Sequence, residues 1–391
     1  MKPAARTEAA IELLDAVIAA AREGGAAADT LVARYFAQRR YAGSKDRRAV
    51  RELVYAAIRH AGEVPASGRA AMLALVAGDP SLAATFDGSA HGPQAIEPGE
   101  PVAQAGVAPA WLAERLAASG IAESDLPALV ERAPLDLRVN TLRTTRDALL
   151  AELGAGEAIP ALSDGVRLPQ GHNADALAGL AEVQDAGSQI VSMAAAAEPG
   201  MAVVDLCAGA GGKTLALAAA MRNRGELLAC DTDRARLSRL APRAERAGVT
   251  IAETRLLDPK READALLDWN GRADVVLVDA PCSGTGTWRR NPEARWRLTP
   301  ERLERLVATQ AHVLAVAAPL VRPGGALVYI VCSLLDMEGD GQVAAFLVNH
   351  PGWTAETLAL PSGQPHGSGV RLQPATDGTD GFFVARLRAP C

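Results

Sequence analysis

The chain has 391 residues, of which 49% are hydrophobic, 22% charged and 4% aromatic, and its formal net charge is -6. These proportions are close to those of globular proteins and exclude a disordered chain, while the length indicates two or three domains of roughly 100 to 200 residues. The negative net charge excludes an overall basic field, so any binding of nucleic acid must depend on local basic patches.

The cysteines are Cys207, Cys230, Cys282, Cys332 and Cys391, an odd number without C-x-x-C spacing. This pattern excludes a disulfide framework and a structural zinc site, so we expect free thiols and no metal. No apolar run is long enough to cross a membrane, and the first residues lead into a polar amphipathic helix rather than a signal peptide. We therefore expect a cytoplasmic, monomeric protein without a membrane partner.

Residues 1–76 are predicted to be helical, because apolar residues recur at helical spacing, as in the stretch 11–18. Residues 34–59 carry eight basic side chains against two acidic ones, with tyrosine and phenylalanine interleaved. Such a stretch is often only a solvated helix face, but the aromatic residues favour a surface that faces RNA. Arg47 and Arg48 are our candidates for contact with RNA.

Residues 77–105 are rich in Gly, Pro, Ser and Asp and are predicted to be a linker. The next region, residues 106–180, is predicted to be a small α+β module. It combines helices near 111–119 and 145–153 with an alternating strand at 135–140 and an extended piece at 165–168.

Residues 181–391 show a different pattern, in which short apolar strands alternate with helices. The predicted strands are 202–206, 226–230, 250–253, 275–278 and 326–331. This alternation predicts a doubly wound α/β fold with a buried parallel sheet and right-handed crossovers. The turn after the first strand, 205–214, is rich in glycine, which allows the backbone to approach a ligand at a helix N-terminus.

Two familiar interpretations of this turn fail. A Walker A loop needs glycine where Cys207 stands, and the dinucleotide fingerprint needs glycine where Thr214 stands. The second strand ends at Asp231, where a carboxylate would accept hydrogen bonds from a ribose diol. An adenosine-bearing cofactor is therefore expected.

Cys282 and Cys332 each follow a predicted strand, at the edge of the sheet where open α/β folds bind ligands. Carbon 5 of cytosine is a poor nucleophile, so an enzyme that methylates it must first add a thiolate to carbon 6. A second group nearby can then assist elimination of the sulfur, as an activated nucleophile usually works with a neighbouring base. Two neighbouring thiols therefore favour methylation of a pyrimidine ring.

Several stretches carry a resemblance that covers nearly the whole chain. They are the turn 205–213, the run 279–286, the strand end 332–333, and the segments 134–140, 184–188 and 380–385. Together they resemble the RNA 5-methylcytosine methyltransferases of the RsmB/Sun (Fmu) type, in the bacterial ribosomal RNA branch. The helices around 43–55 are similar to the NusB-like RNA-binding domain of that branch. The resemblance implies a Rossmann-like methyltransferase domain.

The resemblance also implies roles for individual residues. S-adenosyl-L-methionine would lie against the backbone of Cys207, Ala208, Gly209, Ala210, Gly211, Gly212 and Lys213. Asp231 would hold its ribose, Asp258 would lie by its adenine, and Asp279 would lie between the cofactor and the target base. Cys332 would be the nucleophile that adds to carbon 6, and Cys282 would help to release the product. Lys213 would steady this cluster of charges.

The basic run after Cys282 offers a second candidate for RNA binding. Arg289 and Arg290 would bind phosphates there, and Trp288 and Trp296 would stack on bases. The competing interpretation of this run is an ordinary solvated helix start. The chain departs from the family pattern at two places, Val331, where Thr or Ser is usual, and Gly339, where Asn is usual.

The expected function is therefore methylation of cytosine C5 in RNA, and the resemblance implies small-subunit (16S) ribosomal RNA as the substrate. A transfer RNA methyltransferase remains an alternative. So does a DNA cytosine methyltransferase, in which Cys282 would be the nucleophile and Cys332 would be idle. A third alternative is a non-catalytic RNA-binding assembly factor that keeps the fold and the cofactor pocket.

Overall fold

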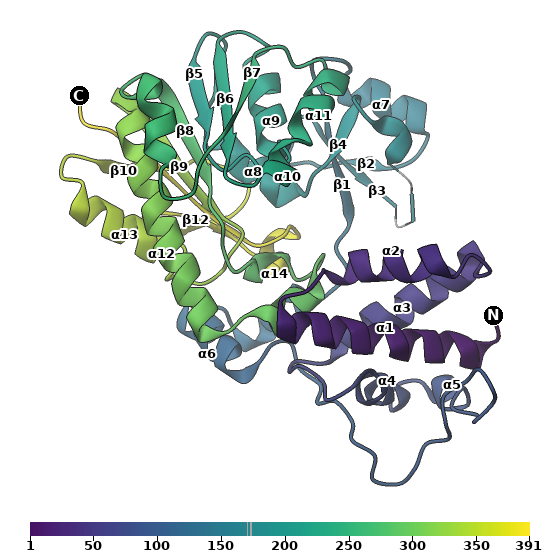
Figure 1. Ribbon diagram of the computed structural model, residues 1–391. Coiled ribbons are helices and arrows are strands. Elements are labelled where there is room, and N and C mark those ends of the chain that lie inside the picture. Colours follow the sequence, from purple (N-terminus) through teal and green to yellow (C-terminus); the bar gives the residue numbers. More distant parts are fainter. Residues whose placement is uncertain (170, 173) are drawn as a thin grey trace. The chain divides into compact units, whose positions relative to one another are not determined.

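The computed structural model describes residues 1–169, 171–172 and 174–391, which form two compact units (Figure 1). Unit 1 comprises Met1–Arg132 together with Thr287–Thr299, and unit 2 comprises Ala133–Gly286 together with Pro300–Cys391. The chain thus leaves unit 2 after Gly286, contributes a short segment to unit 1 and returns. No helix in the described ranges has the length and apolar character needed to cross a membrane.

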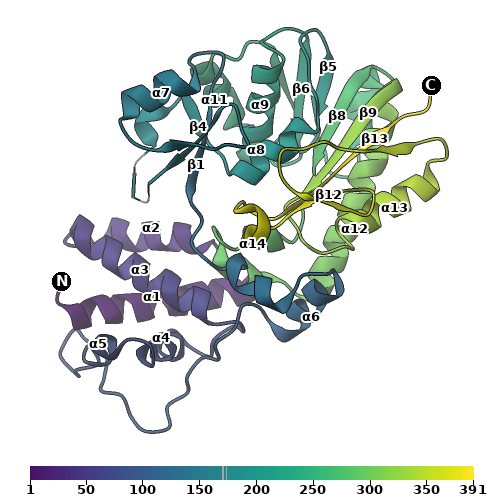
Figure 2. The same cartoon turned by 180° about the vertical axis from the view of Figure 1, so that it is seen from behind.

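Unit 1 is built of helices, which Figure 2 shows from behind. They are α1 (Pro3–Glu23), α2 (Ala28–Gln38), α3 (Ser44–His60), α4 (Gly68–Val76), α5 (Pro80–Ala83), α6 (Ala110–Ala118), η1 (Glu123–Leu129) and η5 (Pro292–Arg297). Local signals set their ends: the Ser67 side chain caps α4, and Gly24 ends α1 at a φ of 75°. Their apolar faces meet in a core that includes Leu14, Ile58 and Met72.

The predicted linker 77–105 does not separate two units in the structure. Its chain packs on α4, where the Arg69 side chain is bonded to the Glu100 carboxylate and to the carbonyl of Ala95 (3.1 Å). The backbone N–H of Ala103 donates to Ala70 (3.0 Å). The composition of this stretch gave no sign of these contacts. The division between the units falls instead at Arg132, inside the predicted module 106–180.

The segment Thr287–Thr299 closes helix ends of unit 1. Arg295 is fully buried, and its guanidinium donates to the carbonyls of Ile58 (2.5 Å) and Ala61 (2.8 Å) at the C-terminus of α3. Burial lowers the pKa of Arg295 to about 9. The last carbonyls of a helix have no partner within it, and a cation there is favoured by the helix dipole.

Two more side chains of this segment act on α1 and α2 in the same way. Arg297 donates to the carbonyls of Gly25 (2.8 Å) and Ala26 (2.7 Å), just beyond the C-terminus of α1. Glu293 accepts from the backbone N–H of Ala28 (3.0 Å), the first residue of α2. Within the stretch whose charge pattern predicted RNA binding, Glu293, Arg295 and Arg297 therefore act as helix caps.

Unit 2 begins with a small antiparallel sheet of order β2-β3-β1-β4. Its elements are β1 (Leu135–Val139), α7 (Arg146–Leu153), β2 (Glu157–Ala158), β3 (Gly165–Leu168), η2 (Asp175–Leu177) and β4 (Ala181–Val183). Leu137, Val139 and Leu149 form its core with other apolar residues. The Asn140 amide donates to the carbonyls of Gly179 and Ala247 (both 2.8 Å) and so ties this sheet to the larger part of unit 2.

The predicted doubly wound α/β fold is confirmed in the rest of unit 2. The parallel strands are β5 (Ala202–Asp205), β6 (Glu226–Asp231), β7 (Ala252–Leu256), β8 (Ala273–Asp279) and β9 (Val321–Val331), in the order β9-β8-β5-β6-β7. Antiparallel strands extend the sheet beyond β9. They are β10 (Thr354–Glu356), β11 (Gln364–His366), β12 (Gly369–Leu372) and β13 (Phe382–Arg388). This antiparallel extension was not predicted.

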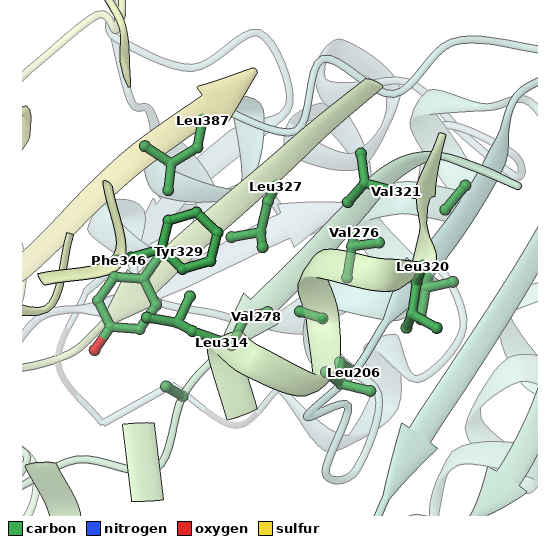
Figure 3. Packing of buried hydrophobic residues seen from close by; sticks show 14 of the residues in the cluster. Leu206, Val276, Val278, Leu314, Leu320, Val321, Leu327, Tyr329, Phe346 and Leu387 are labelled. Atoms are coloured by element: carbon green, nitrogen blue, oxygen red, sulfur yellow. The ribbon is translucent and has the colours of Figure 1, made fainter. Parts of the chain in front are cut away.

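Helices cover both faces of this sheet (Figure 1). The helical elements are α8 (Ala186–Met193), α9 (Gly212–Ala220), α10 (Arg234–Leu237), α11 (Leu240–Ala247), η3 (Glu262–Trp269), η4 (Thr285–Thr287), α12 (Pro300–Ala317), η6 (Ala318–Leu320), α13 (Asp340–Asn349) and α14 (Pro374–Asp377). Figure 3 shows one face, where Val278 and Tyr329 of the sheet pack against Leu314 of α12 and Phe346 of α13. The alternate strand residues pack on α8 and α9, so the sheet is buried on both sides.

Candidate active site

The two cysteines predicted to act together lie at the carboxyl ends of β8 and β9. These strands are parallel neighbours in which Asp279 is paired with Ile330, and the backbone N–H of Ala280 donates to Ile330 (2.9 Å). The register places the next residues of both chains at one edge of the sheet. There, the sulfurs of Cys282 and Cys332 are 3.4 Å apart, and both side chains are half-buried.

The surroundings of the two sulfurs differ. The hydrogen bond with Cys332, together with burial, raises the pKa of the Cys282 thiol well above its usual range. Cys282 therefore holds its proton at neutral pH.

A lysine and a carboxylate accompany the sulfurs. The ammonium group of Lys213, in the first turn of α9, lies 2.7 Å from the carboxylate of Asp279. Burial opposes the charge on Lys213, but Asp279 and the nearby Cys332 outweigh it, so the pKa of Lys213 is raised. Lys213 thus keeps its positive charge beside Asp279. The structure brings together the predicted catalytic residues Cys332, Cys282, Asp279 and Lys213.

The glycine-rich turn between β5 and α9 is closely packed at two of its glycines. Gly209 and Gly211 have φ angles of 55° and 88°, and a Cβ on either would meet Arg236 or Leu240 within 2.6 Å. Beside Gly212, at the start of α9, there is open space where a side chain would begin. The turn therefore presents the N-terminus of α9 with free room in front of it.

Asp231, at the end of β6, faces this turn. Its carboxylate accepts from the backbone N–H groups of Gly209 and Asp233, each at 2.7 Å. Each oxygen keeps a further lone pair, so these bonds leave capacity for a ribose hydroxyl. Asp258 is exposed in the turn after β7, and in the described part of the chain its carboxylate makes no hydrogen bond to the glycine-rich turn.

The residues predicted to bind RNA lie in unit 1 and differ in exposure. Arg47 and Arg48 are exposed on α3. Arg289 is buried and Arg290 is half-buried. Trp288 and Trp296 are also buried, so the expectation that they stack on bases is wrong in this conformation.

Sequence reasoning missed the role of Glu338. This fully buried residue accepts hydrogen bonds from the residues that follow both cysteines, Ser283 and Ser333. A signal was available, because a glutamate in the turn after the second cysteine is part of the family pattern. At the neighbouring Gly339, a Cβ would lie 2.9 Å from the ring of Phe383, so this packing leaves no room for the usual asparagine.

No cluster of three or more His, Cys, Asp and Glu side chains that could hold a metal ion occurs within residues 1–169, 171–172 and 174–391.

The doubly wound sheet and the glycine-rich turn after its first parallel strand define a Rossmann-like protein, and two sulfurs are in contact at the edge of its sheet. The chain belongs to the family described as 16S rRNA methyltransferase RsmB/F, whose model matches residues 192–388. The resemblance on which the sequence expectations depended is thereby confirmed.

Individual relatives agree with this family. The chain is 38% identical over 300 residues to "Probable ribosomal RNA small subunit methyltransferase B" of Synechocystis, a match that covers 72% of this chain and 66% of the relative. It is 35% identical over 297 residues to "Ribosomal RNA small subunit methyltransferase B" of Sodalis glossinidius, covering 71% and 65%. The chain thus spans just under two thirds of the length of these curated relatives. Among solved structures it is similar to that of PH0851, with a TM-score of 0.78, 25% identity and 99% of each chain covered.

Proposed function

We propose that this protein transfers a methyl group from S-adenosyl-L-methionine to carbon 5 of a cytosine in RNA, and that small-subunit ribosomal RNA is the substrate. The observation that carries the proposal is the contact of the Cys282 and Cys332 sulfurs at 3.4 Å beside the Lys213 and Asp279 pair. The RsmB/F family and the small-subunit methyltransferases among the relatives support the substrate class. Such a substrate would place the reaction in the cytoplasm.

The turn after β5 fits the proposed cofactor. It offers the N-terminus of α9 with open space at Gly212, and Asp231 retains acceptor capacity for a ribose. One carboxylate oxygen of the fully buried Asp205 has no partner among the described residues, so a donor from a ligand could satisfy it. When bound there, S-adenosyl-L-methionine supplies the methyl group. Residues Cys207–Lys213, Asp231, Asp258 and Asp279 stay our proposed cofactor contacts.

In the proposed reaction, Cys332 adds as a thiolate to carbon 6 of a cytosine that has been flipped into the site. Lys213 stabilises the thiolate before attack, and Asp279, its ion-pair partner, holds the amino edge of the base. The addition makes carbon 5 nucleophilic toward the methyl donor. For release, Cys282 donates its proton to the departing Cys332 sulfur as the bond between that sulfur and carbon 6 breaks, and the Cys282 sulfur takes up the proton that carbon 5 loses.

The experiment that tests this function supplies labelled S-adenosylmethionine with small-subunit RNA, transfer RNA or DNA. We expect the wild type to label the ribosomal RNA and Cys332→Ala to label nothing. Cys282→Ala should leave a covalent protein–RNA adduct, seen as a slow band on a denaturing gel, because addition and methyl transfer proceed while release stalls. Equal labelling by wild type and Cys332→Ala would refute the role of Cys332. RNA binding without any methyl transfer would favour an assembly factor.

A further inference from the structure

Glu338 is a fully buried carboxylate to which the proposed chemistry gives no task. It lies in the turn between β9 and α13, and both of its oxygens are occupied. Oε1 accepts from the backbone N–H of Ser283 (2.8 Å) and from the Gln310 amide (2.9 Å). Oε2 accepts from the Ser333 hydroxyl (2.6 Å) and from the Ser283 hydroxyl.

These partners are the neighbours of the two cysteines. Ser283 follows Cys282 directly, and Ser333 follows Cys332 directly. The Gln310 amide also donates to the carbonyl of Pro281 (2.9 Å), the residue before Cys282. A single carboxylate therefore joins both sulfur-bearing loops beyond the point where the pairing of β8 and β9 ends.

The turn that carries Glu338 is itself anchored to the sheet. Its carbonyl accepts from the Tyr329 hydroxyl of β9 (2.6 Å), and its N–H donates to Leu335 (3.0 Å). No lysine, arginine or histidine in the described ranges forms an ion pair with this carboxylate. Four neutral donors satisfy it instead. The carboxylate therefore cross-links the loops through directional hydrogen bonds and does not neutralise a positive charge.

We propose that Glu338 is a positioning residue that holds the sulfurs of Cys282 and Cys332 at the separation needed for release of the methylated product. The proposal rests on the function proposed above. Addition to carbon 6 requires Cys332 alone, whereas release requires Cys282 to reach the adduct that Cys332 has formed. A shift of about 1 Å between the loops can cost a step roughly a hundredfold, so release depends on the cross-link more than addition does.

The test compares Glu338→Ala with Glu338→Gln on small-subunit RNA. In Glu338→Ala we expect addition and single-turnover methyl transfer to persist, multiple turnover to fall on the order of tenfold or more, and a covalent adduct to accumulate. In Glu338→Gln we expect turnover close to wild type and no accumulation. The amide keeps one carbonyl acceptor, and the Ser283 and Ser333 hydroxyls can rotate to accept from its NH₂ group.

Ser333→Ala provides a milder variant that removes one arm of the cross-link and leaves Glu338 in place. It should accumulate the adduct to a smaller extent, and it carries the test if Glu338→Ala fails to fold. The matched control is Asp136→Ala, which removes another fully buried carboxylate of unit 2, bonded to Arg167 (2.7 Å). It should lower stability without accumulating adduct.

The inference is overturned if folded Glu338→Ala or Ser333→Ala turns over without accumulating adduct, or if addition and release decline together as in the Asp136→Ala control. Failure of the proposed function would give a different experimental result. In that case Cys332→Ala would still methylate RNA, or Cys282→Ala would trap no adduct, whatever the behaviour of the Glu338 variants.

Discussion

Asp205, the residue at the end of β5, has a buried carboxylate with few hydrogen-bond partners. The Thr214 hydroxyl donates to one of its oxygens (2.7 Å), while the other has no partner among the described residues. Burial, which that hydrogen bond only partly opposes, raises the pKa of Asp205 to about 7. Ionisation of Asp205 near neutral pH therefore opposes folding of unit 2.

The variant Asp205→Asn should reveal this opposition through the pH dependence of stability. The pKa of Asp205 is about 4 in the unfolded chain and about 7 in the folded one. Its favourable contribution to the free energy of unfolding is therefore present in full below pH 4 and is lost as pH rises through 7. The difference amounts to about 4 kcal/mol at most. We expect Asp205→Asn to gain stability relative to wild type between pH 5 and pH 8 in urea unfolding without cofactor. A constant difference across this range would contradict the assignment.

The paired sulfurs show how far single residues can be predicted. Cys282 and Cys332 each follow an apolar strand, and neighbouring parallel strands end at the same edge of a sheet, so their approach follows from sequence order and fold class alone. Glu338 could not be found in this way, because its partners Ser283 and Gln310 lie far from it in the chain. Only the folded loops show that one carboxylate joins them.

At the scale of elements, the segment η5 supplies side chains that cap one end of each of three helices of unit 1, namely α1, α2 and α3. Its Arg295 donates to the last carbonyls of α3, and its Glu293 accepts from the first N–H of α2. The indole N–H of Trp296 donates to Ala61 (3.2 Å), while its ring joins the helical core. Because these side chains are buried, the segment contributes to the stability of unit 1.

We expect Arg295→Ala to destabilise unit 1 by about 3 kcal/mol, because it leaves buried carbonyls without donors and opens a cavity. The measurement is the urea midpoint of the transition that the helical unit undergoes. Arg34→Ala, which removes the same charge from an exposed position of α2, is the matched control and should change the midpoint little. Equal midpoints for both variants would show that the caps contribute nothing.

Elements were predictable where the pattern was local and strong. The strands β5, β6, β8 and the last part of β9 each contain a continuous apolar run, which is the pattern of a sheet covered on both faces. The strands β10 and β11 have three residues each and are partly exposed, so their pairing depends on distant partners rather than on local pattern. The capping roles of Arg295 and Arg297 could not be predicted for a related reason, since charge alone does not show which carbonyls will surround an arginine.

On the scale of the whole molecule, the balance of charge leaves RNA recognition to local surfaces. The formal net charge is -6, yet the exposed face of α3 carries Arg47, Arg48 and Arg51 close together. The guanidinium Nε–H of Arg47 donates to the carbonyl of Ala42 (2.8 Å), and the residue is exposed. We propose this face as the phosphate-binding surface of unit 1.

The double variant Arg47→Glu/Arg48→Glu should weaken the binding of ribosomal RNA and reduce the dependence of log affinity on log salt concentration by a slope of about 2, one for each phosphate that is no longer neutralised. Filter binding at several salt concentrations measures both quantities. Arg222→Glu, a reversal at an exposed position of unit 2, is the control and should leave the slope unchanged. An unchanged slope in the double variant would exclude this face from RNA contact.

The excursion of the chain through Thr287–Thr299 has a consequence for biosynthesis. A domain at the start of a protein ordinarily folds while the ribosome is still synthesising the later domains. Glu293, Arg295 and Arg297 cap the N-terminal helices, but they are synthesised only after more than half of the polypeptide beyond Arg132 has been translated. A nascent chain halted at Arg132 would contain those helices without these caps. Unit 1 can therefore be completed only after much of the sheet of unit 2 has been synthesised.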